Sequence, residues 1–397
     1  MKQIYTQTER IHSLDSLRAI MMLLGLVLHS ALTYNVTVYG DAWSLKDPQS
    51  KSLFCDYIVL LIHSFRMPLF FLVAGFFGAM LFYEKQPFKM IKNRISKIVY
   101  PFILFLFLLY PLIVFAFGYT KAVFSLKQNS LSFASESFLN STTFLPQTTF
   151  HLWFLYYLIF ITVTSVLLGL LFKKTKRLTR WITKYFSFII QNPIIRILFF
   201  SILTFLILTI LGVSMVDASV SFIPELNPFV FFLFFYLVGW MLFKSNFFLE
   251  LLSNYAWTST IAAIIITTIQ GLLIKKMDLE PNSNYWILIL LSSITVWLFT
   301  FGITGLFFRY CNNYSSRMRY ISDASYWVYL IHLPLTAIIP SFIWKLPFPA
   351  IVKFLIVLSL TTFICFVSYH YLVRNTFIGK FLNGKITLKK LWVPKLD

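Results

Sequence analysis

Charged side chains are scarce in this sequence. Asp, Glu, Lys and Arg together make up 12% of its 397 residues, whereas hydrophobic residues make up 58%. Soluble domains usually carry about 25% charged residues, so this composition excludes an ordinary soluble domain. Apolar runs of about 20 residues, the length that a helix needs to cross a bilayer, recur along the chain. The composition therefore predicts an all-α, polytopic membrane protein.

Cysteine is also rare, with three residues in the whole chain. Cys55 falls in a predicted outer segment, Cys311 in a predicted inner segment, and Cys365 in a predicted span. No disulfide is expected between sites so placed. The sequence also lacks the HExxH and paired-cysteine spacings that are typical of zinc sites, so no metal is expected.

Ten apolar runs predict ten transmembrane helices. A membrane barrel would instead show alternating strands of about ten residues. No intervening segment resembles a soluble domain, so residues 1–397 are interpreted as a single transmembrane domain with a basic tail over 373–397. The predicted spans are 14–35, 57–83, 95–117, 150–172, 194–213, 222–243, 256–274, 284–308, 321–343 and 350–372.

Acidic residues are scarcer still, with 14 against 34 Lys and Arg, which gives a net charge of +20. In a soluble protein such an excess would suggest nucleic acid. Here the basic residues lie in short segments between apolar runs, so no nucleic acid partner is expected. The segments on the N-terminal side of the membrane hold 24 of the 34, and those on the opposite side hold 8. The positive-inside rule therefore predicts that both termini are cytoplasmic.

The first span carries polar groups that are costly in hydrocarbon. Arg18 and His29 are eleven residues apart, which places them on one helix face about 16 Å apart along the axis. This face would connect a cationic site inside with an imidazole further out. A structural interpretation stays open, because Arg18 also has Asp15 as an ion-pair partner three residues earlier and His29 can hydrogen-bond between helices.

Other spans carry similar groups. His63 and Arg66 share one face of the second span, and a guanidinium this deep is hard to explain as a side chain that reaches for headgroups. His151 opens the fourth span beside Trp153, a position that is also common for a boundary aromatic belt.

The ninth span holds a polar stripe. Ser322, Ser325, Tyr329 and His332 follow one another at spacings of 3, 4 and 3, so they share one face of a helix. Stripes of this kind face a cavity or a partner helix rather than lipid.

Four of the six histidines share a depth. His29, His63, His151 and His332 all fall near mid-membrane or in the outer half of the predicted spans. A single polar cavity would explain this agreement, and a general base that acts on a hydroxyl suits imidazole well. The alternative is a proton-coupled transporter of a small anionic or sugar substrate. The sequence shows no pair of Gly- or Pro-broken helices of the kind that transporters often have.

Four sequence blocks resemble the acyltransferase-3 superfamily of membrane O-acyltransferases. They are LDSLRA with a histidine eleven residues after its arginine, HSFRMPLFFLVAGFF, HLWFL and ASYWVYLIHLPL. The blocks are most similar to the glucan biosynthesis protein C branch of that superfamily. One departure is that Leu333 follows His332 where that branch tends to have a second histidine.

The resemblance implies a multi-pass protein of the bacterial inner membrane. It implies transfer of a succinyl or acetyl group from cytoplasmic acyl-CoA, as co-substrate, to a hydroxyl of a periplasmic glycan such as osmoregulated periplasmic glucan. No bound cofactor is expected, and the sequence does not indicate an oligomeric state.

The predicted roles follow from this reaction. His29 is the predicted base, and Arg66, Tyr329 and His332 are candidates to stabilise the oxyanion. A covalent acyl-histidine relay is an open variant. The predicted acyl-CoA-binding residues are Arg18, Asp15, Lys92 and Arg94, because Arg suits phosphate. The predicted acceptor-side residues are His63, His151, Trp153 and Ser325.

Overall fold

The computed structural model describes residues 11–127, 129–139, 144–245, 249–279 and 285–384, and the regular elements in these ranges are all helices. Ten of them are long and apolar enough to cross a membrane, which confirms the predicted number of spans. These spans are α1 (His12–Leu32), α2 (Leu53–Glu84), α3 to α4 with η2 (Pro87–Phe124), η4 with α6 (Phe150–Lys174), α8 (Pro193–Leu211), α9 (Leu226–Lys244), α11 (Ala256–Leu279), α12 (Tyr285–Tyr310), α13 with α14 (Ser316–Ile343) and α15 with η5 (Ala350–Val373).

The segments between the predicted spans contain further helices. Residues 118–149 hold the last turns of α4 and the short helix α5 (Ser130–Leu139). Residues 173–196 contain the amphipathic helix α7 (Lys176–Gln191). The tail includes α16 (Phe377–Asn383), and its residues 385–397 lie outside the described part of the chain. The single-domain interpretation stays a prediction.

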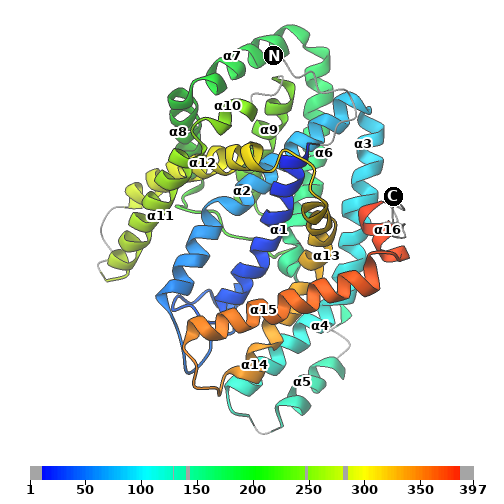
Figure 1. Cartoon of the computed structure of the whole chain (residues 1–397), viewed down its shortest axis with the longest axis vertical. Helices are drawn as coiled ribbons and strands as arrows, with labels where there is room; N and C mark the ends of the chain where they lie inside the picture. Colours follow the sequence, from blue (N-terminus) through cyan, green and yellow to red (C-terminus); the bar gives the residue numbers. More distant parts are fainter. Residues whose placement is uncertain (1–10, 128, 140–143, 246–248, 280–284, 385–397) are drawn as a thin grey trace, which may run out of the picture.

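Helix α1 lies at the centre of the fold (Figure 1), where it packs against α2, α12, α13 and α15. Its first residue, His12, contacts Tyr314 with ring centroids 5.6 Å apart, and His370 near the end of the last span contacts Tyr320 at 6.2 Å. The chain therefore enters the first span and leaves the last span at the same end of the bundle. We call this end the terminal face and the other the distal face. That the terminal face is cytoplasmic stays a prediction.

Close approach between backbones fixes α2 against α9. A Cβ at Gly75 would lie 1.9 Å from the carbonyl oxygen of Tyr236, and one at Gly239 would lie 1.8 Å from that of Leu72. Only glycine fits at both places, as is common where membrane helices cross. The crossing anchors the half of α2 that follows its internal Pro68.

A buried ion pair ties the segment between α1 and α2 to the last span. Lys353 Nζ lies 3.2 Å from Asp47 Oδ2 and donates to the carbonyl oxygen of Trp344 at 2.6 Å. The same carboxylate accepts the backbone N–H groups of Gln49 and Ser50. The pair thereby holds the 33–52 segment, which covers the distal end of α1, in one conformation.

We expect Lys353→Met to destabilise the protein by about 3–5 kcal/mol. Removal of the ammonium leaves the fully buried carboxylate of Asp47 without its countercharge. The thermal unfolding midpoint of the purified protein measures the effect. Lys345→Met, an exposed lysine at the same end of the molecule, is the matched control and should leave the midpoint nearly unchanged. Equal midpoints for Lys353→Met and the unaltered protein would refute this role.

Candidate functional site

One face of α1 runs between two cavities. Arg18, Met22, Gly25 and His29 follow one another at helical spacing. Arg18 and Met22 line a cavity toward the terminal face, and His29 lines a chamber toward the distal face. Gly25 is the position where the side chain of Arg66 comes close to α1, because a Cβ there would lie 2.3 Å from Nη2 of Arg66. The guanidinium of Arg66 therefore rests directly against the backbone of α1.

Arg66 reaches α1 from α2 at the middle of the fold. Its Nε donates to the carbonyl oxygen of Met21 at 3.0 Å, which fixes the plane of the guanidinium. Pro68 lacks an N–H, so it leaves the carbonyl of Ser64 without its usual helical donor one turn earlier. Both Ser64 and Arg66 line the distal chamber, where the helix is thus locally polar.

Three histidines from distant parts of the sequence meet beside this arginine. The ring centroids of His29 and His332 are 5.2 Å apart, and those of His332 and His151 are 5.3 Å apart. They come from α1, η4 and α13, and only His29 of the three lines the distal chamber. His63 lines the same chamber from α2. The predicted convergence of the four imidazoles is therefore found, as a cluster of three with His63 nearby.

Backbone carbonyls set the orientation of two of these rings. Nδ1 of His332 lies 2.8 Å from the carbonyl oxygen of Tyr329, and Nε2 of His151 lies 2.9 Å from that of Leu330. These nitrogens must carry protons in order to donate. Leu330 is available because Pro334, four residues later in α13, has no N–H to give it. The hydroxyl of Tyr329 donates to the carbonyl oxygen of His151 at 2.7 Å, so hydrogen bonds link Tyr329 to both His332 and His151.

Each imidazole keeps one buried nitrogen without a hydrogen-bond partner in the described part of the chain. They are Nδ1 of His29, Nδ1 of His151 and Nε2 of His332. In neutral rings the last two must be acceptors, because the other nitrogen of each ring already donates. Unpaired buried polar atoms are rare in folded proteins and are concentrated at functional sites. The cluster therefore holds free proton acceptors in a protected place.

Trp43 holds His29 from the distal side. The two rings stack with centroids 5.4 Å apart, and Nε1 of Trp43 donates to Oγ1 of Thr33 at 3.1 Å. In the same segment Lys46 donates to the carbonyl oxygen of Leu32, and burial lowers the pKa of Lys46 to about 8. The contact between Trp43 and His29 was not predictable from the sequence, because Trp43 lies in an irregular segment with no helical spacing to His29.

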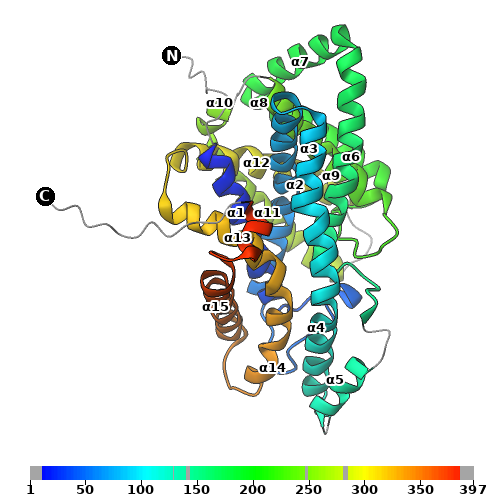
Figure 2. The ribbon, with the colours of Figure 1, turned by 90° about the vertical axis from the view of Figure 1, so that its right-hand side faces the viewer.

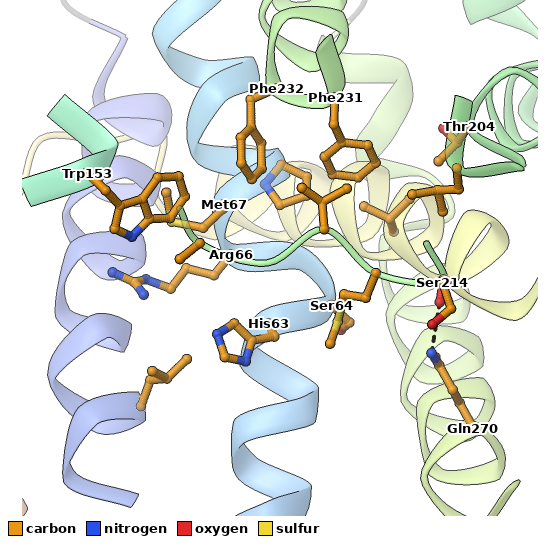
Figure 3. A pocket seen from close by; sticks show the side chains of 18 of the residues that line it. His63, Ser64, Arg66, Met67, Trp153, Thr204, Ser214, Phe231, Phe232 and Gln270 are labelled. Atoms are coloured by element: carbon orange, nitrogen blue, oxygen red, sulfur yellow. Dashed lines mark hydrogen bonds between the residues drawn. The ribbon is translucent and has the colours of Figure 1, made fainter. Parts of the chain in front are cut away.

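The distal chamber has a volume of about 810 Å³ with its mouth included. Figure 3 shows His63 and Arg66 projecting from α2 into it, with Trp153 above the guanidinium. On the far side Nε2 of Gln270 donates to Oγ of Ser292 at 2.8 Å. The described lining contains aromatic rings, hydroxyls and the amide of Gln270, and it contains no carboxylate. Its aromatic and polar members away from α1 and α2 are Trp153, Phe231, Phe232, Thr204, Ser214, Gln270 and Ser292.

The terminal cavity is larger, about 1280 Å³ with its mouth included, and strongly basic. Asp323 is its one acidic lining residue in the described part of the chain, and it pairs with Arg319 at 2.8 Å. Phe70 and Phe154 line the wall of the cavity, and their rings pack against each other with centroids 4.4 Å apart. The cationic residues that line it are Arg18, Arg94, Lys97 and Arg319.

Some predicted residues lie elsewhere than expected. Lys92 is exposed and does not line the terminal cavity, because it is two residues from Arg94 and so faces the opposite side of α3. Ser325, predicted on the acceptor side, lines the terminal cavity instead, since it lies two turns from His332 toward the terminal face. The hydroxyl of Tyr329 already donates to His151, so it is not a free oxyanion donor.

The other predicted residues lie near the two cavities. Arg18 is 3.5 Å from Asp15, as their spacing predicted. Arg94 lines the terminal cavity, and Trp153 lines the distal chamber. His151 is buried behind the chamber. Lys97 and Arg319 were missed, although Lys97 belongs to the same run of basic residues as Arg94.

A family of acyltransferases matches this chain of ten spanning helices. The family model described as an acyltransferase domain, acyltransferase-3, matches residues 11–370, and the chain belongs to this family. It is thus an acyltransferase of the membrane. The chain is 25% identical over 398 residues to glucans biosynthesis protein C of Shigella dysenteriae serotype 1 (strain Sd197), with 96% of each chain covered.

A second relative is similar to the same extent. Glucans biosynthesis protein C of Escherichia coli (strain K12 / DH10B) is 25% identical over 391 residues, again with 96% of both chains covered. No solved structure matches the chain.

Proposed function

We propose that this protein moves an acyl group, succinyl or acetyl, from cytoplasmic acyl-CoA to a hydroxyl of a periplasmic glycan, across the inner membrane of a bacterium. The observation that carries the proposal is that His29 and Arg66 line the distal chamber, while Arg18, on the same face of α1 as His29, lines a chemically different, basic cavity. The names of the curated relatives support a glucan as acceptor. Membership of an acyltransferase family favours acyl transfer over the alternative of a proton-coupled transporter.

The terminal cavity suits the acyl donor. Coenzyme A is a polyanion, and guanidinium groups bind phosphate through paired hydrogen bonds. Arg18, Arg94 and Lys97 line the cavity from α1, α3 and η2, so their charges converge from separate elements. The thin arm of the donor would run along the packed rings of Phe70 and Phe154 toward the cluster, where the thioester carbonyl would meet Arg66.

The distal chamber suits a neutral sugar. Sugar rings stack on aromatic faces and exchange hydrogen bonds with amides and hydroxyls, and Trp153, Phe232 and Gln270 offer these groups. The described lining has no carboxylate to repel an anionic substituent on the glycan. His63 and Ser64 lie at the floor of the chamber and would contact the acceptor beside the reacting hydroxyl.

The reaction needs one proton shuttle. His29 takes the proton from the acceptor hydroxyl as the oxygen attacks the thioester carbonyl carbon. The guanidinium of Arg66 stabilises the oxyanion in a site closed to bulk water. The C–S bond then breaks, the thiolate of coenzyme A takes the proton back from His29, and the ester remains on the glycan. The buried Nδ1 of His29 and Nε2 of His332 are free to share a proton while His29 is charged.

Mass spectrometry of glycans tests the proposed function. Periplasmic glucan and lipopolysaccharide are isolated from cells with and without the gene. A succinyl or acetyl mass present only with the gene identifies both the group and the polymer. Unchanged glycans together with substrate counterflow in vesicles would favour a transporter and refute the proposal.

We expect Arg18→Ala to raise the KM for acyl-CoA roughly tenfold, because it removes a charge-assisted hydrogen bond to a phosphate. The KM for the acceptor should change little, since Arg18 lies at the opposite end of α1 from the distal chamber. Initial rates over titrations of each substrate measure both constants. Lys92→Ala is the matched control, because Lys92 is exposed outside the cavity. Equal changes in both KM values would contradict this assignment.

A further inference from the structure

One face of helix α7 is exposed in the part of the chain that the structure describes. Figure 2 shows it across the top of the molecule, joined to α6, and it packs against α6, α8 and α9. Phe186 and Ile190 are buried in that packing, while Trp181 is 58% exposed and Phe188 is 64% exposed. A basic helix with such aromatic side chains lies at a membrane interface.

An apolar slot of about 620 Å³ lies among α6, α7 and α9. Leu168 and Phe172 line it from α6, Ile182 from α7, and Leu237 and Trp240 from α9. Leu167, Leu170 and Leu171, exposed on α6, place this side of the molecule against the hydrocarbon of the bilayer. A slot of this size beside lipid would lose many dispersion contacts if it were empty.

The mouth of the slot is cationic. A second hollow of about 590 Å³ is lined by Arg180, Lys184 and Lys244, and it shares Lys244 and Thr179 with the apolar slot. The ammonium of Lys244 lies 5.3 Å from the ring centroid of Tyr83, which keeps it at the junction. None of these three cations takes part in an ion pair recorded for the described ranges.

We propose that the slot binds one phospholipid with an anionic headgroup. An acyl chain occupies the space between Leu168, Ile182 and Trp240, and the phosphate lies among Arg180, Lys184 and Lys244. Charge and polarity change along the slot as they do along a phospholipid, from hydrocarbon to anion. The terminal face is the predicted cytoplasmic side, where anionic lipids attract basic segments. The inference does not depend on the proposed acyl transfer, because the slot shares no lining residue with either cavity of the candidate site.

Lipid titration of the purified protein tests this site. Phosphatidylglycerol and phosphatidylcholine are added separately in detergent, and bound lipid is counted by native mass spectrometry. We expect phosphatidylglycerol to bind more tightly. The combined variant Arg180→Gln, Lys184→Gln and Lys244→Gln should lower its affinity roughly 100-fold, since each basic residue near an anionic surface contributes about a factor of five. The matched control replaces three exposed basic residues of the terminal face, Lys85, Lys89 and Arg317, with Gln and should keep the affinity.

The position of the acyl chain has its own test. Leu168→Trp fills the slot and should reduce binding of phosphatidylglycerol while the three cations remain. Wild-type affinity in this variant, or in the charge variant, overturns the site. Equal binding of the two lipids overturns the anionic headgroup. The thermal midpoint gives one further check: inorganic phosphate alone should not raise it, and an increase equal to that with phosphatidylglycerol would identify a free anion and refute the proposal.

Discussion

Replacement of His29 by alanine is expected to reduce acyl transfer about a thousandfold, within the range that a general base contributes. His29 is the one member of the three-histidine cluster that lines the distal chamber, so it alone can reach an acceptor hydroxyl there. His332 and His151 remain behind it with their orientation set by backbone carbonyls. The rate with saturating acyl-CoA and acceptor, measured for purified protein in vesicles, tests this expectation.

The control for His29 is another histidine of the same chain. His370 contacts Tyr320 at the terminal face, far along the last span from the cluster, and His370→Ala should keep the activity. Both variants should show similar protein levels and thermal midpoints, because loss of activity through unfolding would be uninformative. A His29→Ala protein that is as active as His370→Ala would remove the proposed base and the mechanism with it.

Much of the fold and part of the site could be predicted from patterns along single helices. Apolar length gave the ten spans, because each must cover the same thickness of hydrocarbon. The polar stripe from Ser322 to His332 predicted a helix face turned inward, and both side chains are buried. The shared depth of the four histidines predicted their convergence, because burial in hydrocarbon is too costly for isolated polar groups.

The rest depends on contacts between distant parts of the chain. Trp43 meets His29 only because the ion pair of Asp47 with Lys353 holds an irregular segment over α1, and no local spacing encodes that contact. The side of a short helix on which each residue lies was equally hard to predict from the sequence. Lys92 and Arg94 looked equivalent as charges, yet only Arg94 turns toward the terminal cavity.

The contact made possible by Pro334 was predictable in part. Pro334 is visible in the sequence, and its missing N–H predicts a free carbonyl at Leu330. That His151 uses this carbonyl was not predictable, since the two residues are 179 positions apart. The proline that removes one hydrogen bond from α13 thereby leaves the acceptor that orients a ring of the cluster. The free carbonyl of Leu330 follows from the sequence, whereas its donor, His151, is known only from the structure.

Replacement of Arg66 by lysine is expected to lower kcat by roughly a hundredfold, the loss that follows removal of one oxyanion donor. The guanidinium is oriented by the bond from Nε to the carbonyl oxygen of Met21 and is confined by Gly25. An ammonium keeps the charge but has neither the planar fork nor a second donor in a fixed direction. The KM for acyl-CoA should change little, because Arg66 lies beyond the basic terminal cavity. Steady-state rates separate kcat from KM.

Gly25→Ala offers an independent route to the same result. The added Cβ would lie 2.3 Å from Nη2 of Arg66, so it should displace the guanidinium and lower kcat without any change in charge. Arg196→Lys is the matched control, because Arg196, like Arg66, donates to a backbone carbonyl, in this case that of Ile190. It is buried and lines neither cavity. It should keep kcat. If Arg66→Lys retained full kcat while Gly25→Ala lost it, the space beside α1 rather than the guanidinium would be what the reaction requires.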